Sequence, residues 1–382
     1  MKKLLSVVGA RPNFIKIAPL DKAFRKYRKE VKHLICHTGQ HFDDRMSKVF
    51  FEDLGLPRPN FYLGVGGGSH AEQTARIMLE LEKVILAEKP DLVIVPGDVN
   101  STLAAALVAS KMGIPVAHVE AGLRSFDNTM PEEINRIVTD VVSEYLFVSE
   151  HSGIRNLRDE GVDEHKIHFV GNIMIDSLEE HYEMLEEHPI IEQMGLEKEN
   201  YILATFHRPS NVDEEESLKA LIDTLKRLSK ERPLVFPVHP RTRKNLAAFG
   251  LDKRLPKGLT LTEPLGYIEF LALMRYAELV ITDSGGIQEE TTYLGVQCIT
   301  VRKNTERPVT IDVGTNHLVG TDLEKVEKVA MDILGGITKP GRIPEMWDGK
   351  TGKRIAEIIV ENMAEGRGQR AWGREQRAES RG

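Results

Sequence analysis

Short apolar segments alternate with helical patterns along almost the whole chain, and this alternation constrains the fold more than any other feature. A first series of apolar segments reads LLSVV, HLICH, DLVIV, PVAHV, EYLFV and KIHFV, and a second reads YILATF, PLVFPV, LTLTE, LVIT and QCITV. Strands that are apolar on both faces are typical of parallel sheets covered by helices on both sides. The two series predict an α/β protein with two doubly wound, Rossmann-like domains.

A polar, acid-rich stretch at residues 171–200 separates the two series. We therefore expect an N-terminal domain over residues 1–172, a C-terminal domain over 173–362, and a polar tail over 365–382. In open parallel sheets, ligands bind beyond the carboxyl ends of the strands, so the loops that follow the strands are the places to search for a site. With two such domains, the cleft between them is the expected location.

Composition excludes several classes of protein. The 382 residues are 41% hydrophobic and 29% charged, and the net charge of −7 argues against a dedicated nucleic-acid binder. No apolar run approaches the ~20 residues of a membrane span. The N-terminal apolar run is short and leads into Arg11 and Pro12, so we interpret it as a strand and the protein as cytoplasmic. Cys36 and Cys298 lie in strand-like runs and are expected to be buried thiols.

Three loops after the first series contain charged residues near helix starts. In GARPNFIK, Arg11 and Lys16 lie where an anion is favoured, although a capped turn with solvated charges explains this loop slightly better. The stretches PGDVNST, HVEAGLRS and PEEINR add Asp98, Glu120 and Glu132 at the same predicted sheet edge. The helix dipole alone explains an acid such as Glu132, but three clustered acids favour acid–base chemistry.

The loops after the second series indicate an anion site. His207 and His239 follow successive strands, each with an arginine close by. In VITDSGGIQEE, two glycines lead into a helix whose first amides suit a diphosphate, and Glu290 can accept hydrogen bonds from a ribose. A tight turn with acids on the helix dipole is the alternative. Arg307 follows the last strand and can close over phosphates.

The remaining sequence motifs give little information about function. In GGGSHAE, Ser69 and Glu72 fit a capping box at the start of a helix. The chain has no P-loop lysine signature, no H-E-x-x-H and no C-x-x-C. Sequence spacing gives no specific support for a metal among the candidate ligands, which are Asp98, His118, Glu120, His207 and His239.

Taken in order, GARPNFIK, PGDVNST, HVEAGLRS, PEEINR, DSGGIQEE and TERP resemble the motifs of the non-hydrolysing UDP-N-acetylglucosamine 2-epimerases, from about residue 4 to about residue 362. The resemblance implies a fold of the glycosyltransferase-B type, with the active site in the interdomain cleft and a last helix, about 351–364, packed back on the N-terminal domain. It implies interconversion of UDP-N-acetylglucosamine and UDP-N-acetylmannosamine, by elimination of UDP to 2-acetamidoglucal and re-addition.

The resemblance also implies a homodimer that acts in cell-surface polysaccharide biosynthesis, without a nicotinamide cofactor or an obligatory metal. The residues that match the family's catalytic set are Asp98, Glu120, Glu132 and His207, with Arg11, Lys16 and Arg136 beside them. Those that match its UDP site are His239, the backbone near Phe270, Ser284, Gly285, Gly286, Glu290 and Arg307. These residue types suit the implied reaction. Removal of the weakly acidic C2 proton needs a positioned base, and the leaving diphosphate needs amides, arginine and histidine to stabilise its charge.

Some members of the family are activated by their own substrate. They carry a further glutamine and two arginines at positions where this chain has Asp43 and Pro209. The resemblance therefore implies epimerisation without implying such activation. Other enzyme interpretations are a retaining glycosyltransferase of the same fold, a hydrolysing 2-epimerase, and an epimerase of a related sugar such as a 2,3-diacetamido uronate. A UDP-sugar-binding regulator would not need the intact set of acids.

Overall fold

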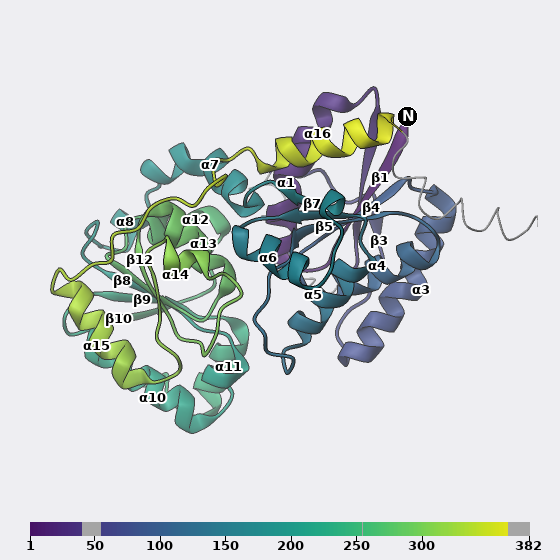
Figure 1. Cartoon of the computed structure of the whole chain (residues 1–382). Coiled ribbons are helices and arrows are strands. Elements are labelled where there is room, and N and C mark those ends of the chain that lie inside the picture. The colour runs from purple at the N-terminus through teal and green to yellow at the C-terminus, as the bar shows by residue number, and fades with distance from the viewer. Residues whose placement is uncertain (40–54, 254, 366–382) are drawn as a thin grey trace, which may run out of the picture. The chain divides into compact units, whose positions relative to one another are not determined.

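The computed structural model describes residues 1–39, 55–253 and 255–365. The chain divides into two compact units, one formed by Met1–Ser177 with Glu345–Gly382 and the other by Leu178–Pro344. Each unit contains one fully parallel sheet with helices packed around it (Figure 1). The predicted α/β architecture with two doubly wound sheets is confirmed.

The first unit is built on a seven-stranded sheet in the order β3-β2-β1-β4-β5-β6-β7. Its strands are β1 (Lys2–Val8), β2 (Val31–His37), β3 (Phe61–Tyr62), β4 (Leu92–Pro96), β5 (Val116–Ala121), β6 (Tyr145–Val148) and β7 (Ile167–Phe169). The direction of strand addition reverses between β1 and β4. The loops after these two strands therefore flank the point at which open parallel sheets bind ligands.

The helices of the first unit include two with prolines in their first turns, Pro12 and Pro131, as the sequence indicated. The helices of this unit are α1 (Arg11–Phe24), η1 (Arg25–Tyr27), α3 (His70–Glu88), α4 (Asn100–Lys111), α5 (Pro131–Val142), α6 (His151–Asp159), η2 (Glu164–Lys166), the start of α7 (Ile173–Glu186), and α16 (Thr351–Ala364). The capping box before α3 is present, because Ser69 Oγ accepts from Glu72 N and Glu72 Oε2 accepts from Ser69 N. Among the described residues, no helix is long and apolar enough to cross a membrane.

The second unit has a six-stranded sheet in the order β10-β9-β8-β11-β12-β13. Its strands are β8 (Ile202–Thr205), β9 (Leu234–Pro237), β10 (Leu259–Thr262), β11 (Leu279–Thr282), β12 (Gln297–Thr300) and β13 (Asn316–Leu318). Its helices are the rest of α7, α8 (Ile190–Gln193), α9 (Pro209–Val212), α10 (Glu215–Leu228), α11 (Pro240–Ala248), α12 (Tyr267–Arg275), α13 (Gly285–Leu294), α14 (Val309–Asp312) and α15 (Leu323–Leu334). The order reverses between β8 and β11, so the loops after these strands flank the second switch point.

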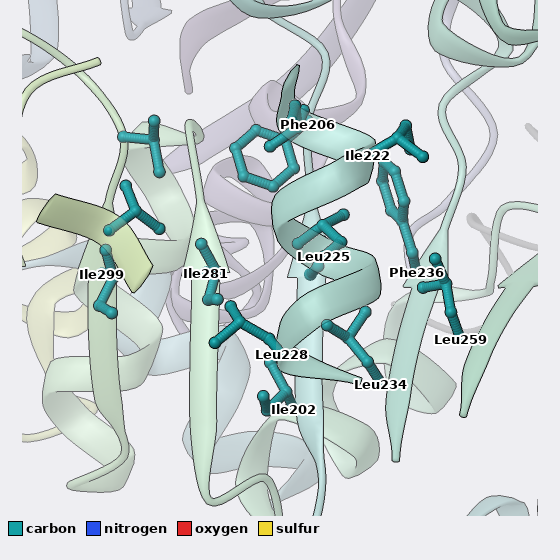
Figure 2. Close-up of a cluster of buried hydrophobic side chains, with 14 of the residues drawn as sticks. Ile202, Phe206, Ile222, Leu225, Leu228, Leu234, Phe236, Leu259, Ile281 and Ile299 are labelled. Atoms are coloured by element: carbon teal, nitrogen blue, oxygen red, sulfur yellow. The ribbon is translucent and has the colours of Figure 1, made fainter. Parts of the chain in front are cut away.

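The core of the second unit shows how the apolar pattern fixes the layers. Along α10, Leu218, Leu221, Ile222, Leu225 and Leu228 are buried at three- and four-residue spacing. This stripe faces the apolar side chains of the sheet (Figure 2). Both cysteines are buried and unpaired, as the sequence predicted.

A buried aspartate fixes the start of the last helix, α16. The carboxylate of Asp176, on α7, accepts the backbone N–H groups of Thr351 at 3.0 Å and Gly352 at 2.7 Å. These two residues open α16, which packs against α1 within the first unit (Figure 1). A Cβ at Gly352 would lie 3.0 Å from the carbonyl oxygen of Pro19, so the close approach of the two helices favours glycine. Burial raises the pKa of Asp176 to about 6, although the two backbone donors act in the opposite direction.

We expect Asp176 to make stability depend on pH. A carboxyl with a raised pKa in the folded state favours folding fully below its unfolded value of 3.8, and this contribution is lost as pH rises through about 6. The free energy of unfolding of the wild type, minus that of Asp176→Asn, should therefore fall by about 2 to 3 kcal/mol between pH 4 and pH 7. Denaturant titrations at several pH values test this, with Asp223→Asn, at a part-exposed position of α10, as the control. A difference that is independent of pH would contradict it.

Candidate active site

The carboxyl edge of the first sheet brings a carboxylate and an ammonium group together beside the switch point. Glu120, at the end of β5, has a φ of 72°, and Gly97, before Asp98 in the turn after β4, has a φ of +68°. Lys16 of α1 donates from Nζ to Glu120 Oε2 at 2.5 Å, and both side chains are buried. A Cβ at Gly97 would lie 3.1 Å from the same Nζ. Lys16 therefore joins the loops that carry Asp98 and Glu120, and the left-handed backbone of Glu120 is a strained feature typical of functional sites.

Helix α5 supplies the partners of Asp98. Arg136 forms an ion pair with the carboxylate of Asp98 through Nη2. Asn135 donates from Nδ2 to the carbonyl oxygen of Asp98 at 2.9 Å. Glu132 lies in the first turn of the same helix and is exposed. The structure thus groups Lys16, Glu120, Asp98 and Arg136, whereas Glu132 is exposed to solvent in the first turn of α5.

Glu133 is a residue that the sequence reasoning missed. Its buried carboxylate accepts from the backbone N–H groups of Ser125 and Phe126 and from Ser125 Oγ. It also forms an ion pair with Arg136 Nη1 at 2.6 Å. Glu133 therefore fixes the loop after β5 and orients the arginine that holds Asp98. The spacing of three residues between Glu133 and Arg136 on a helix was the one available signal.

In the second unit, Asp283 positions His207. Asp283 follows β11 and is fully buried, and it accepts from the backbone N–H groups of His207 and Arg208 and from Asn211 Nδ2. His207 Nδ1 lies 2.9 Å from Asp283 Oδ1. Burial alone would raise the pKa of Asp283, but the donors from His207, Asn211 and Arg208 outweigh it and lower the pKa. The ionised carboxylate holds the proton of His207 on Nδ1, which directs Nε2 of this part-exposed ring to a ligand.

His239 follows β9 and lies beside His207, with ring centroids 5.7 Å apart. It is exposed and caps α11, because its Nδ1 accepts the backbone N–H of Arg241 at 3.2 Å. This bond places the proton of the neutral ring on Nε2, which is then a donor. The two neighbouring histidines thus present ring nitrogens at one sheet edge, as the sequence predicted.

The predicted anion site lies at the start of α13. Ser284 is the N-cap residue, so the N–H groups of Gly285 and Gly286 belong to the first turn and have no acceptor within the helix. A Cβ at Gly285 would lie 2.8 Å from Arg307 Nη1, so the glycine lets the guanidinium lie against the helix start. Arg307 is held there by Glu289, at 2.7 Å from Nε, and by Glu306. Amides and a fixed arginine together favour an anion.

Glu290 lies one turn further along α13 and is buried against α12. The hydroxyl of Tyr267 donates to Glu290 Oε1 at 3.2 Å. Burial raises the pKa of Glu290 to about 8, with a smaller lowering by Tyr267 and a raising by Glu289. Phe270, three residues after Tyr267 on α12, is partly exposed, and its N–H donates to the carbonyl oxygen of Gly266. Tyr267 was not predicted, because no pattern in the sequence links it to Glu290.

Some sequence expectations fall outside the part of the chain that the structure describes. Arg11 is the first residue of α1, but its side chain is not among the described ones, and Asp43 lies in the segment 40–54 outside the described residues. Pro209 is the first residue of α9. Among the described residues, no group of three or more histidine, cysteine, aspartate and glutamate side chains is arranged to hold a metal ion.

We expect Asp283→Asn to destabilise the second unit by about 2 kcal/mol or more, because an amide cannot accept all the donors that converge on this buried position. It should also free His207 from its fixed orientation. Thermal unfolding measures the loss of stability. Asp213→Asn is the matched control, since the ion pair of Asp213 with Arg241 is exposed and contributes about 1 kcal/mol or less. Equal effects of the two substitutions would contradict the role assigned to Asp283.

Comparison with known proteins assigns the chain to one family. The model of a family described as UDP-N-acetylglucosamine 2-epimerase matches residues 23–360. A Methanocaldococcus jannaschii protein named UDP-N-acetylglucosamine 2-epimerase is 44% identical over 94% of this chain and 99% of its own. A Pseudomonas aeruginosa protein named UDP-2,3-diacetamido-2,3-dideoxy-D-glucuronate 2-epimerase is 41% identical over the same shares of the two chains, 94% and 99%.

Solved structures of 2-epimerases resemble this chain over nearly its whole length. The crystal structure of the M. jannaschii UDP-GlcNAc 2-epimerase in complex with UDP-GlcNAc and UDP matches with a TM-score of 0.87 at 44% identity, over 94% of this chain and 99% of that one. The Neisseria meningitidis enzyme bound to UDP-GlcNAc matches with a TM-score of 0.84 at 30% identity, over 94% of this chain and 100% of that one. The likeness therefore extends over nearly the whole of each chain.

Proposed function

The chain belongs to the UDP-N-acetylglucosamine 2-epimerase family, and from this membership we propose that it interconverts UDP-N-acetylglucosamine and UDP-N-acetylmannosamine without net hydrolysis. The observation that carries the proposal is the set of paired charges at the first switch point. There, Asp98 and Glu120 each lie against a cation, Arg136 and Lys16 respectively. Positioned carboxylates of this kind can remove and return a proton on carbon.

The proposed reaction has two balanced halves. A carboxylate removes the proton from C2 while the bond between C1 and the diphosphate oxygen breaks, which gives 2-acetamidoglucal, UDP and a protonated acid. An acid then returns a proton to the opposite face of C2, and the diphosphate oxygen re-forms its bond to C1. We assign the proton transfers to Asp98, Glu120 and Glu132, without dividing the two directions among them. The charges of Lys16 and Arg136 stabilise the electron density that develops on the sugar.

The second unit is proposed to hold UDP. The first-turn amides of α13, with Ser284, Gly285, Gly286 and Arg307, fit a diphosphate. Glu290 fits the ribose, as an acceptor of its two hydroxyls. We assign to His207, oriented by Asp283, the donation of a hydrogen bond to the departing diphosphate from Nε2 in the form of the ring that carries both protons. His239 and the N-terminal turn of α12 near Phe270 complete the proposed nucleotide contacts.

A second candidate substrate has its own support. The 41% identical P. aeruginosa protein is named as the 2-epimerase of a UDP-2,3-diacetamido-2,3-dideoxy-D-glucuronate. Epimerisation at C2 requires the same chemistry for both sugars, so this substrate differs only in the groups at C3 and C5. Both nucleotide sugars therefore belong in the test of the proposal.

The test is proton NMR of the purified protein with each UDP sugar in deuterated water. We expect the epimer to appear with deuterium at C2, and UDP to remain attached to sugar at equilibrium. An epimer without deuterium at C2 would exclude the elimination mechanism. Accumulation of UDP with free N-acetylmannosamine would assign the protein to the hydrolysing type. In the same assay, Asp98→Asn and Glu120→Gln should lower the exchange rate by about 10² to 10⁴. Glu80→Gln, in an exposed ion pair with Lys83 on α3, should leave it unchanged.

The raised pKa of Glu290 predicts a pH dependence of UDP binding. Two ribose hydroxyls donate best to an ionised carboxylate, and a pKa of about 8 means that this form grows about tenfold between pH 7 and pH 9. The ratio of the Kd of Glu290→Gln to that of the wild type should therefore rise by up to about tenfold over this range. Calorimetric titration with UDP measures it, and Glu263→Gln, at an exposed position, is the control. A ratio that does not change with pH would contradict the assignment of Glu290 to the ribose.

A further inference from the structure

His118 lies between two hydrogen-bond acceptors in the interior of the first unit. It is fully buried on β5, two residues before Glu120. Its Nε2 lies 2.8 Å from the carbonyl oxygen of Gly97, and its Nδ1 lies 2.6 Å from Asp140 Oδ1. A carbonyl oxygen can only accept, so Nε2 carries a proton. The state of the ring then depends on where the proton between Nδ1 and Asp140 resides.

The surroundings of Asp140 place that proton on the histidine. Its other oxygen, Oδ2, accepts the backbone N–H of Gly122 at 3.0 Å and lies 2.7 Å from Arg124 Nη1. With Oδ2 held by a guanidinium and a backbone N–H, Asp140 is a carboxylate, which can only accept, so Nδ1 carries a proton as well.

The charges around this pair balance. Arg124 also donates to Glu160, from Nε at 2.8 Å and from Nη2 at 2.7 Å. The network contains two anions, Asp140 and Glu160, and two cations if His118 is an imidazolium. At the same edge Lys16 pairs with Glu120, and Arg136 pairs with both Asp98 and Glu133. With a neutral His118, Arg124 alone would face the two carboxylates, of which Asp140 is fully buried, and a buried carboxylate with too little compensation is costly.

The pair connects the segments that carry the proposed reacting groups. Gly97, which accepts from Nε2, directly precedes Asp98 in a left-handed turn. Gly122, which donates to Asp140, follows Glu120 by two residues. Asp140 itself lies on α5, the helix whose Arg136 forms the ion pair with Asp98. A neutral imidazole, with one N–H, could satisfy only one of the two acceptors.

We propose that His118 carries a proton on both ring nitrogens and, with Asp140, is a positioning residue that sets the spacing of Asp98 and Glu120 for proton transfer. The role in proton transfer rests on the proposed epimerase function, whereas the charge state does not. A displacement of reacting groups by about 1 Å can lower a rate by about 10². Loss of either member should therefore reduce kcat and leave UDP binding, assigned to the second unit, unaffected.

The first measurement is NMR of the full-length protein with ¹⁵N-labelled histidine, at pH 8, where an ordinary imidazole with a pKa of about 6.5 is neutral. We expect N–H signals from both ring nitrogens of His118, which disappear together in His118→Gln. A signal from only one ring nitrogen would overturn the charge state. If His118→Gln does not fold, Asp140→Asn supplies the assignment by shifting the same two signals.

The second measurement compares Asp140→Asn with Glu160→Gln as the matched control. Glu160→Gln removes the other carboxylate that pairs with Arg124, and Glu160 is not a hydrogen-bond partner of His118. We expect Asp140→Asn to lower kcat for deuterium exchange at C2 by about 10² and to keep the Kd for UDP within about threefold of the wild-type value. For Glu160→Gln, we expect both the kcat and the Kd to stay near the wild-type values. An unchanged kcat in Asp140→Asn, or a parallel loss of UDP binding, would overturn the positioning role. A wild type that does not exchange the C2 proton overturns the proposed function, and the histidine signals still decide the charge state.

Discussion

The reversal of strand order beside the first strand of each sheet is the constraint on which the candidate site depends. Parallel strands place all their carboxyl ends at one edge, and the loops diverge to opposite faces only where the order reverses, between β1 and β4 and between β8 and β11. The segments after these four strands supply Lys16 in helix α1, Asp98, His207 and the start of α13. A chain with the same residues on an antiparallel sheet would scatter them over two edges.

Buried carboxyls in this protein differ in pKa because they differ in the number and charge of their donors. Asp283 and Asp140 are each held by several donors, including a histidine, and these outweigh burial and lower the pKa. Asp176 and Glu290 have neutral donors only, so burial prevails and the pKa rises to about 6 and about 8. The first pair therefore serves as fixed negative charge, and the second pair can change its charge near neutral pH.

The sequence predicted the elements whose signals are local. Apolar runs indicated most strands, Pro12 and Pro131 marked helix starts, and Ser69 with Glu72 marked the cap of α3. Strands β3 and β13 were missed because β3 has only two residues and β13, Asn316–Leu318, contains two polar residues and so forms no apolar run. The partners of the site residues were also missed, because Asp283 and His207 are 76 residues apart and Tyr267 and Glu290 are 23 apart. Such pairs meet only through the order of strands and helices.

The return of α16 to the first unit has a consequence for the order in which the protein folds. The second unit is one continuous segment, whereas the first unit consists of residues 1–177 and a segment that begins at residue 345. Ile355, Ala356 and Ile359 of α16 are completely buried, so the first unit exposes apolar surface until this helix is present. During synthesis from the N-terminus, the second unit can therefore complete its core while the first still awaits its last helix. A shortened chain that ends before α16 would keep every proposed site residue and still lack part of the first unit's core.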